Sequence, residues 1–103
     1  MDAGKWGVEP LVSDYLDYRQ YLSDVYRFRQ RTESVGLRKY NYAAFSAAAD
    51  IRSPNYLRMV IAGERNLSKE MCSKFARALR LDRYQEIEFE ILVRYGQESD
   101  PLK

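Results

Sequence analysis

The sequence predicts an all-α domain of five helices, near residues 14–32, 42–50, 54–62, 68–80 and 83–96. Apolar residues recur three and four positions apart along these segments, and no stretch alternates with the period of two that a half-buried strand requires. Residues that cap helices stand at the predicted beginnings, and glycine stands at two of the predicted ends. With 103 residues, of which 46% are hydrophobic, the chain suffices for one domain with a small core.

The first predicted helix, residues 14–32, is the longest, and its apolar stripe is rich in tyrosine. Ser13 or Asp14 can cap its first turn with a side-chain oxygen. The tyrosines stand among acidic residues, which favours packing in the core over a surface on which nucleic-acid bases stack. The stripe comprises Leu11, Tyr15, Tyr18, Leu22 and Val25, and it is widened by Tyr21 and Phe28. The helix ends with three arginines, Arg27, Arg29 and Arg31. Positive charge is favourable at the C-terminal end of a helix, so no bound ligand is needed to explain these residues.

The segment before this helix, residues 1–13, predicts a flexible arm, because it holds two glycines and a proline and has no periodic pattern. Trp6 is the exception, since a large aromatic ring in a polar tail packs on the domain, on a second subunit or on another partner. The arm lacks the apolar centre of a secretory signal, and no run of about 18 apolar residues exists, so we expect no membrane span. The lone Cys72 favours a reduced, cytoplasmic protein.

Residues 33–41 predict a connector that breaks helical order around Gly36. Arg38 and Lys39 in this connector fit two uses equally well, contact with phosphates or plain solubility. A short helix follows at residues 42–50, and its remaining surface consists of small residues. Its apolar face is formed by Tyr42, Phe45 and Ala49.

The third predicted helix, residues 54–62, begins and ends with clear signals. Ser53 can act as the N-cap, Pro54 suits the first helical position because it has no amide to leave unpaired, and Gly63 closes the helix. Leu57 should point into the core, together with Val60 or Ile61. The opposite face carries the polar candidates Asn55, Tyr56 and Arg58.

The last two predicted helices each carry one apolar stripe. Ser68 caps the first of them, whose stripe runs through Leu67, Met71, Phe75 and Leu79, with Cys72 on an inner face. Asp82 and Gln85 have the spacing of a capping box at the start of the second, and Gly96 should end it before the polar tail, residues 98–103. Its stripe comprises Tyr84, Ile87, Ile91 and Tyr95 and is broadened by Leu92, with Glu86, Glu88 and Glu90 outside. The predicted core comprises Phe45, Leu57, Phe75, Leu79 and Ile91.

Residues 42–81 resemble the helix-turn-helix of the lambda-repressor-like superfamily. The run GERNLS at 63–68 is similar to its joint G-x-R-x-(P)-S, and FARALRL at 75–81 to its closing helix. More broadly, residues 14–97, through DYRQYL, SPNYL and RNLS, resemble the N-terminal half of a family of longer bacterial proteins regarded as regulators. Two features differ from the superfamily: Asp50 stands where its turn has glycine, and the turn is one residue longer.

The resemblance implies sequence-specific binding to duplex DNA in bacterial transcription regulation, with helix 54–62 in the major groove. The expected base contacts are Asn55, Tyr56 and Arg58, and the expected phosphate contacts are Lys39, Arg52, Ser53, Arg65 and Asn66. Asn55 has a local alternative, because asparagine near a helix start often bonds to the backbone. Proteins of this fold commonly pair two half-sites, so a homodimer is expected. The longer family also implies a second regulatory domain or a protein partner.

Charge is concentrated on the same segment. Residues 35–82 hold nine Lys and Arg against four Asp and Glu, a net charge of +5, whereas residues 1–34 hold five against six and residues 83–103 three against five. A polyanion partner explains this surplus, and so does an ordinary basic surface.

The residue inventory narrows the remaining function classes. The chain has no histidine and one cysteine, which leaves metal clusters and nucleophile–histidine arrangements incomplete, so we expect neither an enzyme nor a cofactor. The alternative to DNA binding is a helical module that keeps the fold but binds a protein through its tyrosine-rich helix and Trp6. Salt-dependent binding to duplex DNA separates the two.

Overall fold

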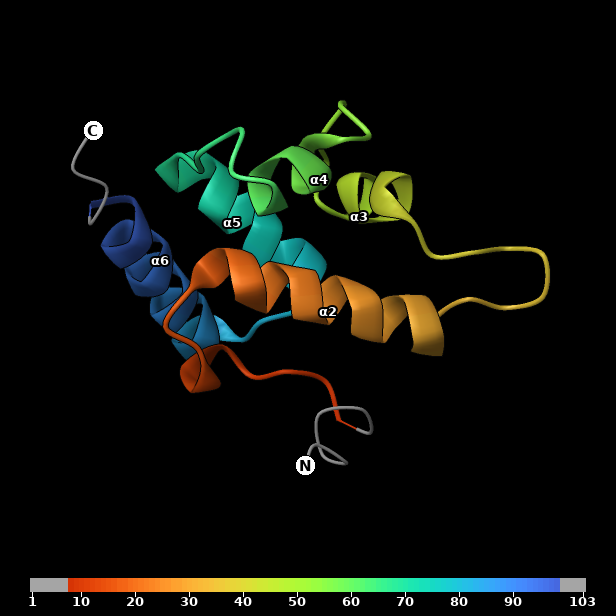
Figure 1. Cartoon of the computed structure of the whole chain (residues 1–103), viewed down its shortest axis with the longest axis horizontal. Coiled ribbons are helices and arrows are strands. Elements are labelled where there is room, and N and C mark those ends of the chain that lie inside the picture. The colour runs from red at the N-terminus through yellow and green to blue at the C-terminus, as the bar shows by residue number, and fades with distance from the viewer. Residues whose placement is uncertain (1–7, 99–103) are drawn as a thin grey trace.

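The computed structural model describes residues 8–98 and consists of five α-helices preceded by one short turn of 3-10 helix (Figure 1). Within these residues no strand forms, and a single isolated bridge joins Val35 to Arg38. For the described residues, the prediction of an all-α fold with five α-helices is therefore confirmed. No helix between residues 8 and 98 has the length and apolar character needed to cross a membrane. The elements are η1 (Val12–Asp14), α2 (Tyr18–Thr32), α3 (Tyr42–Ala48), α4 (Tyr56–Ile61), α5 (Lys69–Leu79) and α6 (Arg83–Glu98).

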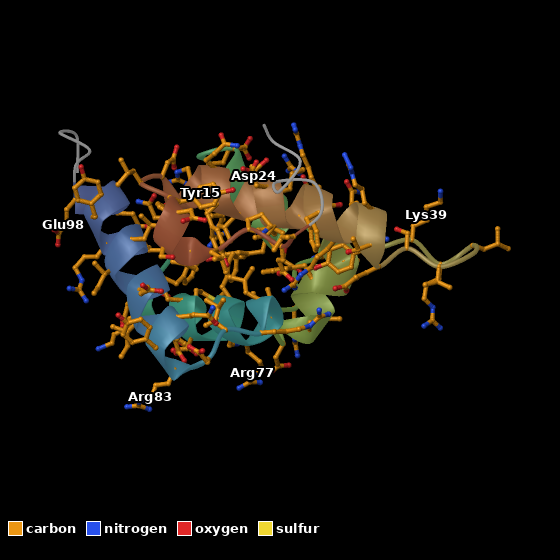
Figure 2. All side chains as sticks on the ribbon, turned by 90° about the horizontal axis from the view of Figure 1, so that it is seen from below. Tyr15, Asp24, Lys39, Arg77, Arg83 and Glu98 are labelled. Carbon is orange, nitrogen blue, oxygen red and sulfur yellow. The ribbon has the colours of Figure 1, made fainter. Side chains whose placement is uncertain are left out.

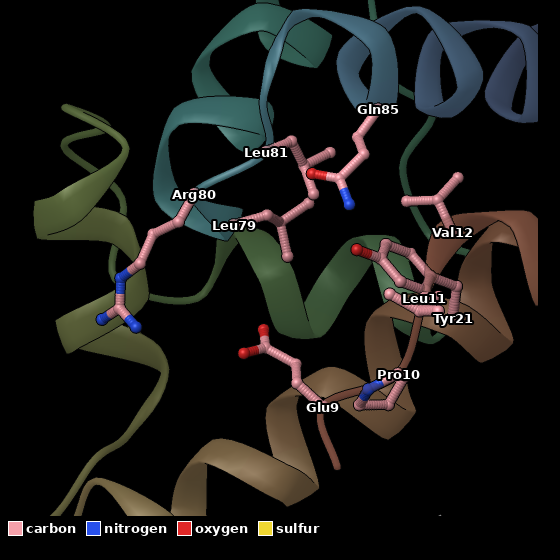
Figure 3. Close-up of a pocket in the computed structure, with 9 residues that line it drawn as sticks. All are labelled: Glu9, Pro10, Leu11, Val12, Tyr21, Leu79, Arg80, Leu81 and Gln85. Carbon is pink, nitrogen blue, oxygen red and sulfur yellow. The ribbon is translucent and has the colours of Figure 1, made fainter.

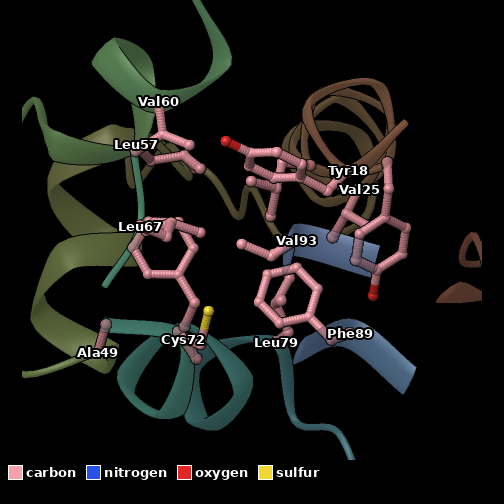
Figure 4. Close-up of a cluster of buried hydrophobic side chains, with 14 of the residues drawn as sticks. Tyr18, Val25, Ala49, Leu57, Val60, Leu67, Cys72, Leu79, Phe89 and Val93 are labelled. Atoms are coloured by element: carbon pink, nitrogen blue, oxygen red, sulfur yellow. The ribbon is translucent and has the colours of Figure 1, made fainter. Parts of the chain in front are cut away.

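The helices enclose one core, in which α2 crosses the others. In Figure 1, α3 and α4 lie at one end of α5 and α6 lies at the other, and α2 contacts both α4 and α6. Phe75 from α5 stands at the centre, with ring centroids 5.0 Å from Phe45 and 6.0 Å from Tyr56. Four predicted core residues, Phe45, Leu57, Phe75 and Leu79, are buried as expected. Figure 4 shows Leu57 and Leu79 within this cluster.

The tyrosines of α2 belong to this core, as predicted. Tyr18 and Tyr21 expose at most 2% of their surface. Burial raises the pKa of the Tyr21 hydroxyl well above its usual range, so the ring stays neutral. The hydroxyl of Tyr15 donates to a carboxylate oxygen of Asp24 at 2.6 Å. The rings of Tyr18 and Tyr21 therefore have no free face for stacking on bases.

Several predicted caps are confirmed. The hydroxyl of Ser68 accepts from the amide of Met71 (3.1 Å), and Gly63 follows α4 with a φ of +84°. Asp82 and Gln85 form the reciprocal capping box, each side chain accepting from the other residue's amide, at 2.8 and 3.0 Å. Signals within a few residues of a helix end therefore placed these boundaries correctly.

Two predicted helix beginnings are wrong. α2 begins at Tyr18, where Asp17 is the N-cap and accepts from the amides of Arg19 (2.9 Å) and Gln20 (3.4 Å). The expected caps Ser13 and Asp14 belong to η1 instead. α4 begins at Tyr56 rather than Pro54, so Ser53 lies in the preceding turn and is not its N-cap.

The segment before α2 packs onto the domain where the structure describes it. Val12 is buried, and Glu9 pairs with Arg29 at 2.7 Å, so residues 8–13 are not a free arm. Trp6 lies outside the described residues. Arg29 has a role that the sequence did not predict: it is only 1% exposed, and its guanidinium donates to the carbonyls of Ala78 and Leu79.

α6 turns the opposite face to the core from the one that the sequence predicted. Its buried residues are Phe89, Val93 and Leu92, of which only Leu92 was part of the predicted stripe, whereas Ile91 is 55% exposed and is not a core residue. The other members of the predicted stripe, Tyr84, Ile87 and Tyr95, are 73%, 48% and 61% exposed. The glutamates that were expected on the outside, Glu86, Glu88 and Glu90, are half-buried.

Gly96 does not end α6, which continues to Glu98. A Cβ atom at this position would lie 2.9 Å from the ring of Tyr18, so the absence of a side chain permits close packing of α6 on α2. Gln97 strengthens the same contact. Its side-chain oxygen accepts from the Tyr18 hydroxyl (3.0 Å) and from the Leu67 amide (2.7 Å), and its nitrogen donates to the Leu67 carbonyl (3.1 Å).

Gly96→Ala is expected to lower the free energy of unfolding by about 1–3 kcal/mol, because the new methyl group overpacks the contact with Tyr18. Helix propensity alone would give the opposite sign, a gain of about 1 kcal/mol. Urea denaturation measures the difference. The same change in a Tyr18→Leu background should cost much less, and a wild-type background that is stabilised by Gly96→Ala would contradict the packing account.

Candidate nucleic-acid interface

The joint between α3 and α4 is a tight turn that hydrogen bonds hold in place. Asp50 adopts a left-handed backbone conformation, with a φ of +59°. The amide of Ile51 donates to the carbonyl of Ser46 (2.9 Å), and the hydroxyl of Ser46 donates to the carbonyl of Ser53 (2.7 Å). From α5, Lys74 donates to the Asp50 carbonyl (3.2 Å). The direction of α4 relative to α3 is therefore fixed by backbone and side-chain bonds together.

α4 has one buried and one exposed face. Leu57 and Val60 are buried, whereas Asn55 and Arg58 are exposed one helical turn apart. Asn55 occupies the N-cap position, but its side chain makes no capping hydrogen bond. The alternative role of Asn55, a hydrogen bond to the backbone at the start of the helix, is therefore not seen as a cap in the structure. Arg52, in the turn just before, is exposed as well.

Tyr56 takes a different position from the one expected of a base contact. It is 7% exposed, and its ring packs against Phe75. The guanidinium carbon of Arg65 lies 4.8 Å from the Tyr56 ring centroid, a cation–π contact. Burial removes Tyr56 from the predicted base contacts, and the ring instead holds Arg65 beside the first residue of α4.

Arg19 was not singled out by the sequence pattern, yet it ties α2 to the end of α4. Its guanidinium donates to the carbonyls of Val60 and Arg65 and to the side-chain oxygen of Asn66, the last at 2.8 Å. These acceptors lie more than 40 residues away along the chain, so local spacing carries no sign of the contact. The bond engages the oxygen of Asn66 and leaves its nitrogen as the donor that could reach a phosphate.

The other predicted phosphate contacts differ in position. Ser53 is half-buried in the turn, and its carbonyl already accepts from Ser46. Lys39 is exposed on the connector between α2 and α3, which extends away from the body of the domain (Figure 2). Four predicted site residues are thus exposed on α4 and its flanks, and Lys39 lies apart from them. The four are Arg52, Asn55, Arg58 and Arg65.

A hollow on another side of the molecule offers no comparable set of groups (Figure 3). It measures about 170 Å³ and lies between the segment before α2 and the loop between α5 and α6. The Glu9 carboxylate points into it, but this group is already paired with Arg29. Among residues 8–98, no three His, Cys, Asp or Glu side chains gather where they could hold a metal ion.

No protein-family model, curated protein or solved structure matches this chain.

Proposed function

We propose that this chain is a lambda-repressor-like helix-turn-helix domain that binds duplex DNA sequence-specifically in bacterial transcription regulation, with α4 as the recognition helix. One observation carries the proposal. The exposed N-terminal part of α4 presents an amide side chain without a cap bond, Asn55, next to the guanidinium of Arg58, with Arg52 and Arg65 on its flanks.

The chemistry of these groups matches what the major groove displays. A guanidinium bonds bidentately to the O6 and N7 atoms of guanine, and an amide bonds to N6 and N7 of adenine. Arg52 and Arg65 flank the helix, where arginine contacts to phosphates position the protein without reading sequence. The hydrogen-bonded turn at Asp50 and the contacts of Arg19 hold α4 in a fixed orientation, which a recognition helix requires.

Arg58→Ala is expected to weaken binding to the preferred duplex by about 1–3 kcal/mol and to relax the preference at one base position. The preferred duplex is first obtained by selecting bound sequences from a random pool. Fluorescence anisotropy then compares the selected duplex with a scrambled one of equal length. Equal losses on both duplexes would assign Arg58 to phosphates, and no loss on either would remove α4 from the interface.

Arg52→Ala, Arg65→Ala and Lys39→Ala are each expected to weaken binding to both duplexes alike. Each replacement should also reduce the slope of log K against log salt by about one unit, because one fewer phosphate is neutralised. Arg83→Ala is the matched control, since Arg83 is exposed on α6, away from α4. A variant whose slope equals that of the wild type would lose its assignment as a phosphate contact.

Absence of salt-dependent binding in the wild-type protein would reject the proposed function itself. The alternative, a helical protein-interaction module with the same fold, would then be favoured, and the exposed apolar face of α6 is the observation that supports it.

A further inference from the structure

The hollow between the segment before α2 and the loop between α5 and α6 contains a buried hydroxyl without a partner. Tyr21 is 1% exposed, and its hydroxyl oxygen points toward the middle of the hollow (Figure 3). Among residues 8–98, no group forms a hydrogen bond with this hydroxyl. The Tyr21 ring packs against the rings of Tyr15 and Phe89, with centroid distances of 5.3 and 6.0 Å, so the hydroxyl has a fixed position.

Two further side chains in the hollow use only one of their polar atoms within the described part of the chain. The oxygen of Gln85 accepts from the Asp82 amide, and its nitrogen points into the hollow (Figure 3). Glu9 accepts both bonds from Arg29 with its Oε2 atom, which leaves Oε1 as an acceptor. Burial and the Glu9 carboxylate raise the pKa of the Tyr21 hydroxyl, so it keeps its proton and can donate.

The charges at the hollow are already balanced by ion pairs within the fold. Glu9 pairs with Arg29 at 2.7 Å, and Arg80 at the edge of the hollow pairs with Glu33, also at 2.7 Å. An anionic ligand would approach the Glu9 carboxylate, and a cationic ligand would approach the two guanidinium groups. The hollow therefore favours a molecule without net charge.

The size and walls of the hollow suit a single ring. It measures about 170 Å³, and apolar cavities of about 150 Å³ admit benzene. The remaining lining is mostly apolar and comprises Pro10, Leu11, Val12, Leu79 and Leu81. Such walls cover the faces of a ring, while the polar groups can reach its edge.

We propose that this hollow is a binding site for a small neutral cyclic amide, a single ring that carries a carbonyl next to an N–H group. The carbonyl accepts from the Gln85 nitrogen and the Tyr21 hydroxyl, and the N–H group donates to Oε1 of Glu9. All three unused groups then gain a partner, which is the condition for burying them without loss.

This site is separate from the proposed DNA-binding face, so the two proposals can fail independently. None of the residues that line the hollow belongs to α3, α4 or the turn between them. Binding is therefore measured without DNA, on the full 103-residue chain.

The probe is 2-pyridone, titrated into the ¹⁵N-labelled protein while backbone amide chemical shifts are recorded. Shifts should fall on residues 9–12, 79–81 and 85, with a Kd on the order of 1 mM, as expected for a ligand of one ring. N-methyl-2-pyridone, which lacks the N–H group, should bind weaker by a factor on the order of 10. Equal binding of the two compounds, or no shifts at about ten times the expected Kd, would overturn the proposal.

Two variants remove one donor each and keep the fold. Tyr21→Phe deletes the hydroxyl, and Gln85→Glu replaces the nitrogen while it keeps an oxygen to accept from the Asp82 amide. Each should weaken binding of 2-pyridone by a factor on the order of 10. Tyr18→Phe is the matched control, because its hydroxyl bonds to Gln97 outside the hollow, and it should bind like the wild type.

Thermal unfolding gives a readout that does not depend on the probe. Tyr21→Phe should unfold at the same temperature as the wild type or higher, since the deleted hydroxyl has no partner in the described fold. A lower unfolding temperature would show that the hydroxyl is already bonded in the free protein. That result, or wild-type binding of 2-pyridone by Tyr21→Phe, would contradict the site.

Discussion

Phe75→Ala is expected to lower the free energy of unfolding by about 3–5 kcal/mol, which is a large fraction of the roughly 5–15 kcal/mol that stabilises a typical domain. The Phe75 side chain is completely buried. Its ring meets Phe45 and Tyr56 edge-on, so the truncation removes contacts to α3 and α4 at once. Both α3 and α4 border the resulting cavity, so it can close only if these helices shift.

Urea denaturation followed by circular dichroism measures this loss. The matched control is Arg77→Ala, an exposed residue two positions along the same helix, which should change stability by no more than about 0.5 kcal/mol. A Phe75→Ala variant that unfolds at the same urea concentration as the control would show that α5 does not hold the core together.

Arg29→Met is expected to cost about 3 kcal/mol, although most arginines on helices can be replaced with little effect. The buried guanidinium donates to the carbonyls of Ala78 (2.7 Å) and Leu79 (2.8 Å) at the end of α5. Methionine fills a similar space but has no donor, so two carbonyls lose their partner in a buried setting. α5 then loses the group that stabilises its C-terminal end.

Arg27→Met on the exposed face of α2 controls for helix propensity and chain length. Glu9→Gln removes the ion pair with Arg29 but keeps the hydrogen bonds from Arg29 to the two carbonyls, so it measures the contribution of the ion pair alone. Because Glu9 is 37% exposed, water can replace its partner, and this variant should lose no more than about 1 kcal/mol. Equal thermal unfolding of Arg29→Met and Arg27→Met would contradict the role given to Arg29.

Local signals predicted the helices well, because they act within a few residues. Ser68 and the Asp82–Gln85 box cap their helices as expected, and Asp50 takes the left-handed conformation that the turn requires. The start of α2 was misplaced because three residues before it, Ser13, Asp14 and Asp17, can all cap a helix. The burial of Val12 next to α6 decides between them, and this is a tertiary contact.

The face of α6 could not be predicted from periodicity, because the helix carries two apolar stripes. One comprises Tyr84, Ile87, Ile91 and Tyr95, and the other comprises Phe89, Leu92 and Val93. The second faces the core because Gly96 lies on its side and lets α6 approach Tyr18, and because Gln97 bonds to the backbone of Leu67. Neither partner is near in sequence.

The candidate site was predicted only in part, because some of its residues are positioned by contacts between helices that are far apart in the sequence. Asn55 and Arg58 lie on the exposed face of a short helix, which local pattern can indicate, and both are exposed. The burial of Tyr56 depends on Phe75, and the position of Arg65 depends on Tyr56. The support from Arg19 comes from a third helix, beyond the reach of any spacing argument.

The most direct test of the DNA-binding account is a map of backbone amide chemical shifts of the ¹⁵N-labelled protein, recorded while the selected duplex is added. The largest changes are expected on residues 52–58 and 65–66, with smaller ones on the connector near Lys39. Amides on the exposed face of α6, around Ile87 and Ile91, should change little. Shifts concentrated on α6, with α4 unaffected, would contradict the assignment of α4 as the recognition helix.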